Sequence, residues 1–246
     1  MTRVGVIVAL LVTRAASAAP PEPPPERLNR ALLGARGPRL GHVVPFGSLG
    51  VALILPQLTL GARVGLGAGF YGEAAYANLA VFGHQGRVRF GWGGAVGRRF
   101  ELGLAAKSSF ATLRLADKQL VGISFSALPL GNDWDVGQEL ALTWNRPGHA
   151  HVTTSVGPLF TLGGLRYDSF DEARFRFEPA LRGVTAAVQG EWSVWRIANV
   201  MLRLDALFLA GVERDRACQA ARQDHCQQLV PLGFVPTGTV GVAWGL

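Results

Sequence analysis

Two histidines separated by one residue are the side chains best suited to catalysis in this sequence. In a strand, His149 and His151 point to the same face, near Thr153 and Ser155. A His beside a Ser can activate a serine nucleophile when an acid completes the set. A lipid hydrolase needs these groups where lipid reaches them, and the apolar face of this segment offers no such set. The sequence therefore predicts that the protein is not an enzyme, and lipid acyl-chain hydrolysis through His151 is a minor alternative.

A second group of reactive residues alternates with apolar side chains along the chain. It contains five basic and five acidic residues: Arg63, Arg87, Arg89, Lys107, Arg203, Glu101, Asp135, Glu139, Glu191 and Asp205. In a closed sheet all ten would face the lumen, where opposite charges pair and an unpaired charge is costly. A selective pore more often carries a ring of one sign. The sequence thus predicts a lumen that is closed or conducts weakly, with a small hydrated pore as the alternative.

The segments that carry these charges have apolar residues at every second position, which predicts β-strands. Ten strands are expected near residues 59–70, 73–83, 87–97, 99–115, 119–129, 134–145, 149–163, 181–197, 199–212 and 232–246. Residues 28–55 are ambiguous, and a hairpin at 39–55 would raise the count to twelve; eight strands is the lower limit. Alternation alone fits both a soluble sandwich, with its apolar face inside, and a membrane barrel, with its apolar face outside.

Three features favour the membrane barrel. Aromatic residues recur ten positions apart on apolar faces, which on tilted strands spans roughly the 25 Å between two aromatic girdles. Strands of up to about seventeen residues exceed the usual length in soluble sheets. Long connections fall at one end of the sheet and short turns at the other. The aromatic pairs are Trp134 with Trp144, Phe100 with Phe110, and Phe234 with Trp244. The long connections are 164–180 and 213–231, and the short turns lie near 197–199, 146–148, 116–118 and 84–86.

The first residues have the pattern of a secretory signal peptide. Arg3 precedes an apolar core from Val4 to Val12, and Ala16-Ser17-Ala18 forms the cleavage motif. Residues 19–26 read APPEPPPE, a polyproline-type spacer that does not join a sheet. We therefore predict a signal peptide at 1–18, a Pro-rich periplasmic arm at 19–40 and a single β-barrel domain at 41–246.

Taken together, these features resemble bacterial outer-membrane β-barrels as a class. Such barrels commonly end in an aromatic residue with apolar residues at alternate positions before it. Val240, Val242 and Trp244 match this pattern, while Leu246 stands in place of the usual Phe or Trp. The resemblance implies an all-β, antiparallel up-and-down transmembrane barrel in a Gram-negative outer membrane. It also implies contact with outer-membrane lipid and lipopolysaccharide, and recognition of the last strand by the barrel-assembly machinery.

Both cysteines of the chain lie in the expected extracellular connection 213–231. An even pair in an exported protein favours a disulfide between Cys218 and Cys226, which would stabilise the fold by roughly 2 to 3 kcal/mol in a chain-entropy estimate. Asp224 and His225 allow a metal-binding interpretation, but seven intervening residues and one His match no structural zinc pattern. No metal and no cofactor is therefore expected.

The basic charge of the chain has to be assigned to its loops and arm. Removal of residues 1–18 lowers the 24 basic side chains to 22, against 17 acidic ones, for a net charge of +5. Loop arginines beside anionic lipid head groups explain this excess without nucleic acid. The expected function is a structural or weakly conducting, porin-like barrel for small solutes. The alternative is a surface-exposed binding or adhesion module that holds an unidentified ligand at loops 164–180 and 213–231.

Overall fold

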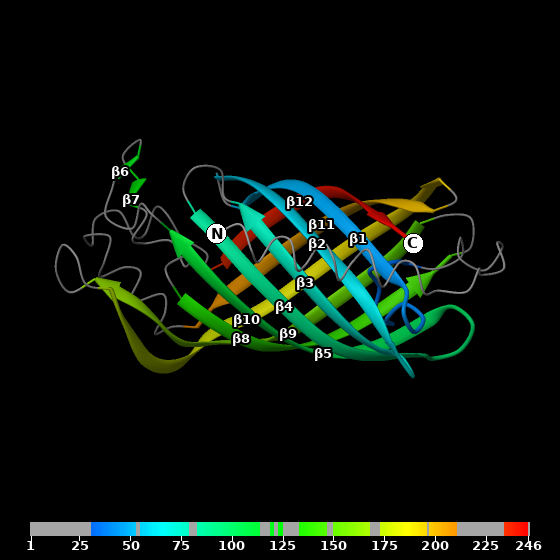
Figure 1. The fold of residues 1–246 in the computed structure, drawn as a ribbon, viewed down its shortest axis with the longest axis horizontal. Coiled ribbons are helices and arrows are strands. Elements are labelled where there is room, and N and C mark those ends of the chain that lie inside the picture. Colours follow the sequence, from blue (N-terminus) through cyan, green and yellow to red (C-terminus); the bar gives the residue numbers. More distant parts are fainter. Residues whose placement is uncertain are drawn as a thin grey trace.

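The protein folds as one closed, all-antiparallel β-barrel of ten strands, as the sequence predicts (Figure 1). The computed structural model describes residues 31–52, 55–78, 83–113, 119–120, 123–124, 133–146, 150–167, 173–195, 197–210 and 234–245. The barrel strands are β1 (Val43–Ala52), β2 (Leu55–Gly67), β3 (Phe70–Asn78), β4 (Gly83–Ala95), β5 (Phe100–Leu113), β8 (Asp133–Asn145), β9 (Ala150–Tyr167), β10 (Ala173–Trp195), β11 (Ala198–Leu209) and β12 (Phe234–Trp244). Sequence neighbours pair all round, and β1 closes the ring by pairing with both β2 and β12.

The apolar face of the barrel is its outer face, which excludes the soluble sandwich. In β8, Leu140 and Leu142 are 49% and 43% exposed, while the alternate residues Glu139 and Thr143 are 5% and 0% exposed. The same alternation runs through the other strands, where Leu60, Val88, Leu104 and Leu204 are all more than half exposed. Among the described residues, none forms a helix long and apolar enough to cross a membrane.

The aromatic residues spaced ten apart lie in register on neighbouring strands. Phe100 pairs with Trp144, and Phe110 pairs with Trp134, across β5 and β8. Both strands therefore carry their aromatic residues at the same two heights on the barrel wall. This direct pairing also shows that no strand separates β5 from β8.

One expected strand is wrong and one strand comes from the region left ambiguous, so the count of ten is unchanged. The described residues of the stretch 119–129 form no barrel strand; they make the two-stranded sheet of β6 (Gln119–Leu120) and β7 (Ile123–Ser124). This stretch alternates but has no charged lumen face, and the register of β5 with β8 leaves no place for it. Residues 39–55 add the single strand β1 rather than a hairpin, because β1 pairs at once with the start of β2.

Because the strands alternate in direction, their connections gather at two ends. The terminal end carries the C-terminal strand end and the turns at 68–69, 96–99, 146–149 and 196–197; the loop end carries the connections 53–54, 79–82, 114–132, 168–172 and 210–233. The turns predicted near 146–148 and 197–199 lie at the terminal end, as expected. The turn predicted at 84–86 is wrong because these residues lie within β4, and the turn predicted at 116–118 lies outside the described residues.

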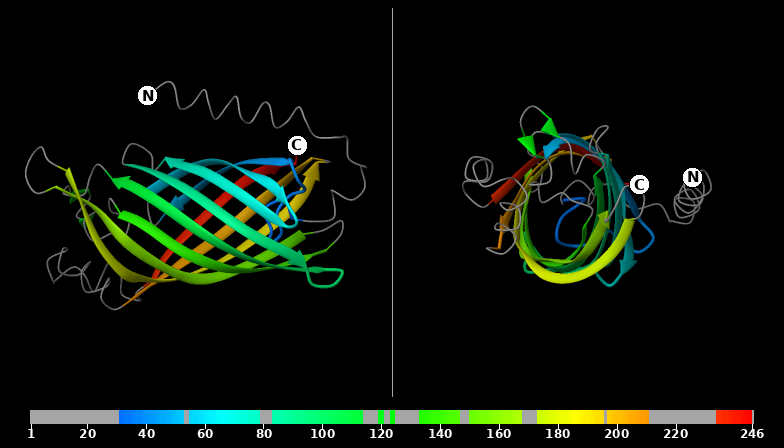
Figure 2. Two further views of the ribbon diagram at one scale, coloured as in Figure 1. Left: turned by 60° about the horizontal axis from the view of Figure 1, so that its bottom comes forward. Right: turned by 90° about the vertical axis from the view of Figure 1, so that its left-hand side faces the viewer.

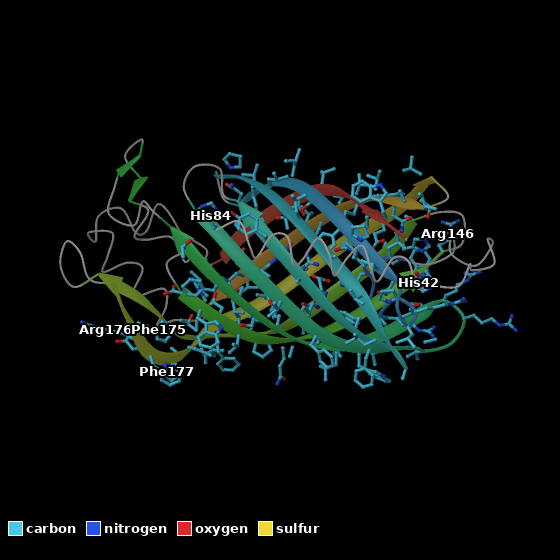
Figure 3. All side chains as sticks on the ribbon, in the orientation of Figure 1. His42, His84, Arg146, Phe175, Arg176 and Phe177 are labelled. Carbon is cyan, nitrogen blue, oxygen red and sulfur yellow. The ribbon has the colours of Figure 1, made fainter. Side chains whose placement is uncertain are left out.

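The expected loop 164–180 is mostly a hairpin. Pairing of β9 with β10 continues to Tyr167 opposite Ala173, so only residues 168–172 connect the two strands. This hairpin extends the barrel wall at the loop end, where Figure 3 places Phe175, Arg176 and Phe177 far from Arg146 and His42 at the terminal end. The backbone N–H and C=O groups of the two strands form hydrogen bonds with each other. The alternation of Phe and Arg in this part therefore belongs to a strand and not to a loop.

Candidate functional site in the barrel lumen

One wall of the lumen carries a row of charges across five neighbouring strands. Arg63 of β2 binds Glu73 of β3, with Nη2 2.6 Å from Oε2. Arg89 of β4 lies between two acids: its Nη2 is 3.1 Å from Oε1 of Glu139 on β8, and its Nη1 is 4.0 Å from Oε2 of Glu73. Lys107 of β5 approaches the other oxygen of Glu139 at 4.0 Å. Cross-strand register brings these residues together, because Glu73 lies opposite both Arg63 and Arg89.

A buried tyrosine supports this row. The ring of Tyr71, 1% exposed, lies beneath the guanidinium groups of Arg63 and Arg89, whose carbons are 4.4 Å and 5.5 Å from the ring centre. Such cation–π contacts favour a fixed guanidinium position where little water is present. Tyr71 thus helps to hold both arginines against the wall.

Ion pairs also line the rest of the lumen. Arg182 of β10 binds Asp135 with Nη1 2.6 Å from Oδ2, and its Nη2 is 3.6 Å from Oδ2 of Asp133. Arg203 of β11 binds Asp205 of the same strand at 2.7 Å. Thr161 donates a further hydrogen bond to Asp135 at 2.9 Å. The lumen charges are therefore mostly neutralised in place.

Sequence reasoning missed Arg182 and Glu73. Alternation assigns Arg182 to the lipid face, in phase with Val184 and Ala186, but irregularities at Phe177/Ala180 and Leu181/Gly183 shift the register and turn it inward. Glu73 is the first residue of the expected strand 73–83 and was not counted. Its inward phase is already visible in the sequence, whereas nothing in the sequence marks the bulge.

These side chains surround a cavity of about 280 Å³. Eight of the ten residues expected to line the lumen lie on its wall: Arg63, Arg87, Arg89, Lys107, Asp135, Glu139, Arg203 and Asp205. Glu73 and Arg182 complete the charged lining, which then has six basic and four acidic side chains. A cavity of this volume with a polar lining accommodates several water molecules. The lumen therefore contains a polar chamber large enough to hold water.

Residues 31–40, here called the inner segment, lie inside the terminal end of the barrel (Figure 2, right). The main anchor is Glu191, which is 1% exposed. Its two carboxylate oxygens accept hydrogen bonds from the backbone N–H of Leu32 at 2.8 Å and of Leu33 at 3.1 Å. Gln189 and Asn199 donate to the same carboxylate at 2.8 Å and 3.0 Å. Four donors satisfy this carboxylate, so the inner segment is part of its stabilisation.

Three further hydrogen bonds fix the inner segment. They join Ala31 N to Asn145 Oδ1 at 3.0 Å, Ala35 N to Thr143 Oγ1 at 2.7 Å, and Arg63 Nη1 to Gly34 O at 2.8 Å. Leu33 packs in a small apolar core with Phe46 and Met201. A Cβ atom on Gly93 or Gly103 would overlap the carbonyl oxygen of Ala35, so these wall positions accept the segment only as glycine.

The remaining predicted residues lie beside the wall residues that bind the inner segment. Glu101, 5% exposed, lies opposite Thr143 in the register, and Glu191 lies opposite His151. His151 is fully buried, and neither of its ring nitrogens has a hydrogen-bond partner among the described residues. Thr143 and Thr153 share a hydrogen bond at 2.9 Å. The structure thus places His151 in the seat of the inner segment, away from the lipid-facing surface where a lipid hydrolase would need it.

Several predictions fall outside the described residues. They concern the signal peptide 1–18, residues 19–30 of the arm, His149, the loop 213–231 and the disulfide between Cys218 and Cys226. Within the described ranges, no group of three His, Cys, Asp or Glu residues is arranged to hold a metal ion.

Known proteins resemble this chain in the shape of the barrel and not in sequence. No protein-family model matches the chain, and no curated protein matches it. The barrel with an apolar outer face is similar to outer-membrane β-barrels at the level of class. Solved structures similar to it include the NanC porin, with 10% identity, a TM-score of 0.43 and coverage of 83% of this chain and 100% of that one.

Two other solved structures show the breadth of this likeness. The N-terminal barrel domain of OprF from Pseudomonas aeruginosa has 9% identity and a TM-score of 0.34, covering 83% of this chain and 96% of that one. Ail, the attachment invasion locus protein of Yersinia pestis, has 7% identity and a TM-score of 0.23, with the same two coverages.

Proposed function

We propose that the protein is an integral β-barrel of a bacterial outer membrane that conducts small solutes weakly, because the inner segment closes its terminal end. In this proposal the terminal end faces the periplasm and the loop end faces the outside. The outer face contacts membrane lipid and lipopolysaccharide, and the last strand, β12, is recognised by the barrel-assembly machinery.

The proposal is supported above all by the contacts that hold the inner segment inside the barrel. Five hydrogen bonds link the inner segment directly to the barrel wall, and Leu33 adds a contact with the apolar core. Each such bond contributes about 1 kcal/mol, and bonds to charged groups contribute more. A segment held this firmly blocks the periplasmic mouth for most of the time.

The exposed apolar side chains support the membrane part of the proposal. Contiguous apolar surface of this extent is not found on soluble monomers, whereas a bilayer covers it at no cost. Aromatic residues at matching heights on β5 and β8 fit the two membrane interfaces.

Conductance of the refolded wild-type chain in a planar bilayer tests this function. We expect brief, small openings from protein whose folding is verified by different gel mobility before and after boiling. Large, steady openings would contradict closure by the inner segment. Release of the chain from membranes by carbonate without detergent would contradict the membrane assignment itself.

A second candidate function is surface binding through the β9–β10 hairpin. Phe175 and Phe177 on its projecting part are 44% and 66% exposed, and Phe175 also contacts the ring of Trp134 at 6.2 Å between centroids. Exposed aromatic residues beyond a barrel wall are typical of binding surfaces. Loss of binding to cells or isolated envelopes after Phe177→Ser, with conductance unchanged, would support this function; unchanged binding would exclude Phe177 from it.

A further inference from the structure

The charges of the cavity wall do not cancel. Each of the four acids has a basic partner close by: Glu73 with Arg63 at 2.6 Å, Glu139 with Arg89 at 3.1 Å, Asp135 with Arg182 at 2.6 Å and Asp205 with Arg203 at 2.7 Å. Lys107 shares Glu139 at 4.0 Å and donates to Thr185 Oγ1 at 2.8 Å. Arg87 is then left over. Among the described residues it has neither an ion-pair partner nor a hydrogen-bond acceptor.

Arg87 faces the open part of the cavity. It lies opposite Ala75 on β3 and Ser109 on β5, so one neighbour is small and the other offers a hydroxyl. Its side chain is exposed and lines the cavity together with Arg203, which repels it, and with Glu73 and Asp205, which attract it from beyond ion-pair distance. Arg203 likewise repels Lys107. Three cations therefore line one cavity, and the acid that binds Arg203 among the described residues, Asp205, already accepts hydrogen bonds from its Nε and Nη2 atoms.

We propose that Arg87, with Arg203 and Lys107, forms a binding site for a small oxyanion inside the barrel. This site deepens the proposed function by naming the class of solute, and it rests on that function only for the entry of the anion through the loop end. A carboxylate or phosphate group between Arg87 and Arg203 would replace their repulsion by two attractions. It would also offset the positive charge that remains in the lining after Asp133, outside the lining, pairs with Arg182.

Guanidinium chemistry sets the ligand class. Arg offers paired N–H donors that match two oxygens of a carboxylate or phosphate, and Lys107 supplies a further charge as an ammonium group. Ser109 and Gln85 line the same cavity and add neutral polar groups beside Arg87. A cavity of about 280 Å³ admits a small ion such as phosphate and excludes a polymer. An inorganic cation would meet the excess positive charge and is disfavoured.

Titration calorimetry with inorganic phosphate tests the site on the full-length protein in detergent at low ionic strength. We expect saturable binding by the wild-type barrel and an affinity at least about 10-fold weaker for Arg87→Gln, equal to about 1.4 kcal/mol. Arg87→Lys keeps the charge without the paired donors, so we expect a smaller loss. Arg98→Gln is the matched control, because Arg98 is exposed in the turn between β4 and β5 and lies outside the cavity lining.

The outcomes separate this site from the proposed function. Absence of saturable phosphate binding by folded wild-type protein would overturn the site, whatever the bilayer conductance. Equal weakening by Arg98→Gln and Arg87→Gln would overturn it as well, because it would reveal general attraction to a basic protein. Binding that depends on Arg87 in a barrel that never conducts would keep the site and overturn solute passage.

Discussion

At the scale of single residues, Arg182 shows how much of the lumen depends on one inward-turned side chain. Its guanidinium is 3% exposed and binds both Asp133 and Asp135. We predict that Arg182→Gln destabilises the folded barrel by about 3 to 5 kcal/mol, because two partly buried carboxylates lose their counter-charge. The loss of the unboiled gel form with increasing urea measures this. Arg98→Gln, a change of the same kind on an exposed turn, should shift the midpoint little; equal shifts would contradict the pairing.

Alternation alone decides the orientation of several charged residues that line the cavity. Arg63, Arg89 and Glu139 alternate with apolar neighbours, and period two puts them on one face. Arg182 was missed because a bulge reverses its phase, and a bulge depends on how two strands pair rather than on either strand alone. The unpaired state of Arg87 was also beyond the sequence, because equal counts of opposite charge do not say which charges meet.

At the scale of elements, the inner segment is held chiefly by Glu191. We predict that Glu191→Gln loosens this segment, because an amide offers one acceptor oxygen where the carboxylate binds Leu32, Leu33, Gln189 and Asn199. The bound state of the inner segment should lose about 1 to 2 kcal/mol of stability. Trypsin cleavage after Arg36 or Arg39 in folded protein should therefore become several-fold faster. Glu178→Gln on the exposed part of β10 is the matched control. Equal cleavage rates in the two variants would show that Glu191 does not anchor the segment.

The sequence left this element undecided because its fold depends on the finished barrel. Residues 31–40 have neither strand alternation nor enough length for a stable helix, and they were assigned to the periplasmic arm. Their contacts come from β2, β8 and β10, which meet only when the ring closes. The strand at 119–129 failed for the opposite reason: local alternation suggested a strand, but β5 and β8 pair with each other.

At the scale of the whole molecule, the membrane assignment depends on the outer face of the ring. Leu204 lies near the middle of β11 and is 57% exposed. We predict that Leu204→Arg reduces the stability of the inserted barrel by about 2 to 4 kcal/mol, because the charge lies in the hydrocarbon layer. Leu204→Ala should cost much less. Gel mobility of protein folded into lipid vesicles measures both, and a harmless Arg at this position would contradict a lipid-covered face.

Fold class was accessible to prediction because every strand repeats the same division between an apolar and a polar face. Three features depend on how the strands pair and do not follow from any one strand alone. They are the closure of the ring, the side on which β1 joins it and the position of the inner segment. At this scale we propose that residues 31–40 close the apolar-faced barrel at its terminal end.

Single-channel conductance of Gly103→Val beside the wild-type chain tests this claim most directly. A side chain at position 103 would overlap the carbonyl oxygen of Ala35 and displace the inner segment, whereas a Cβ at Gly86 meets nothing within 4 Å. We predict larger and longer openings for Gly103→Val, with Gly86→Val behaving as wild type. Identical conductance of all three folded proteins, whether large or absent, would contradict closure of the lumen by the inner segment.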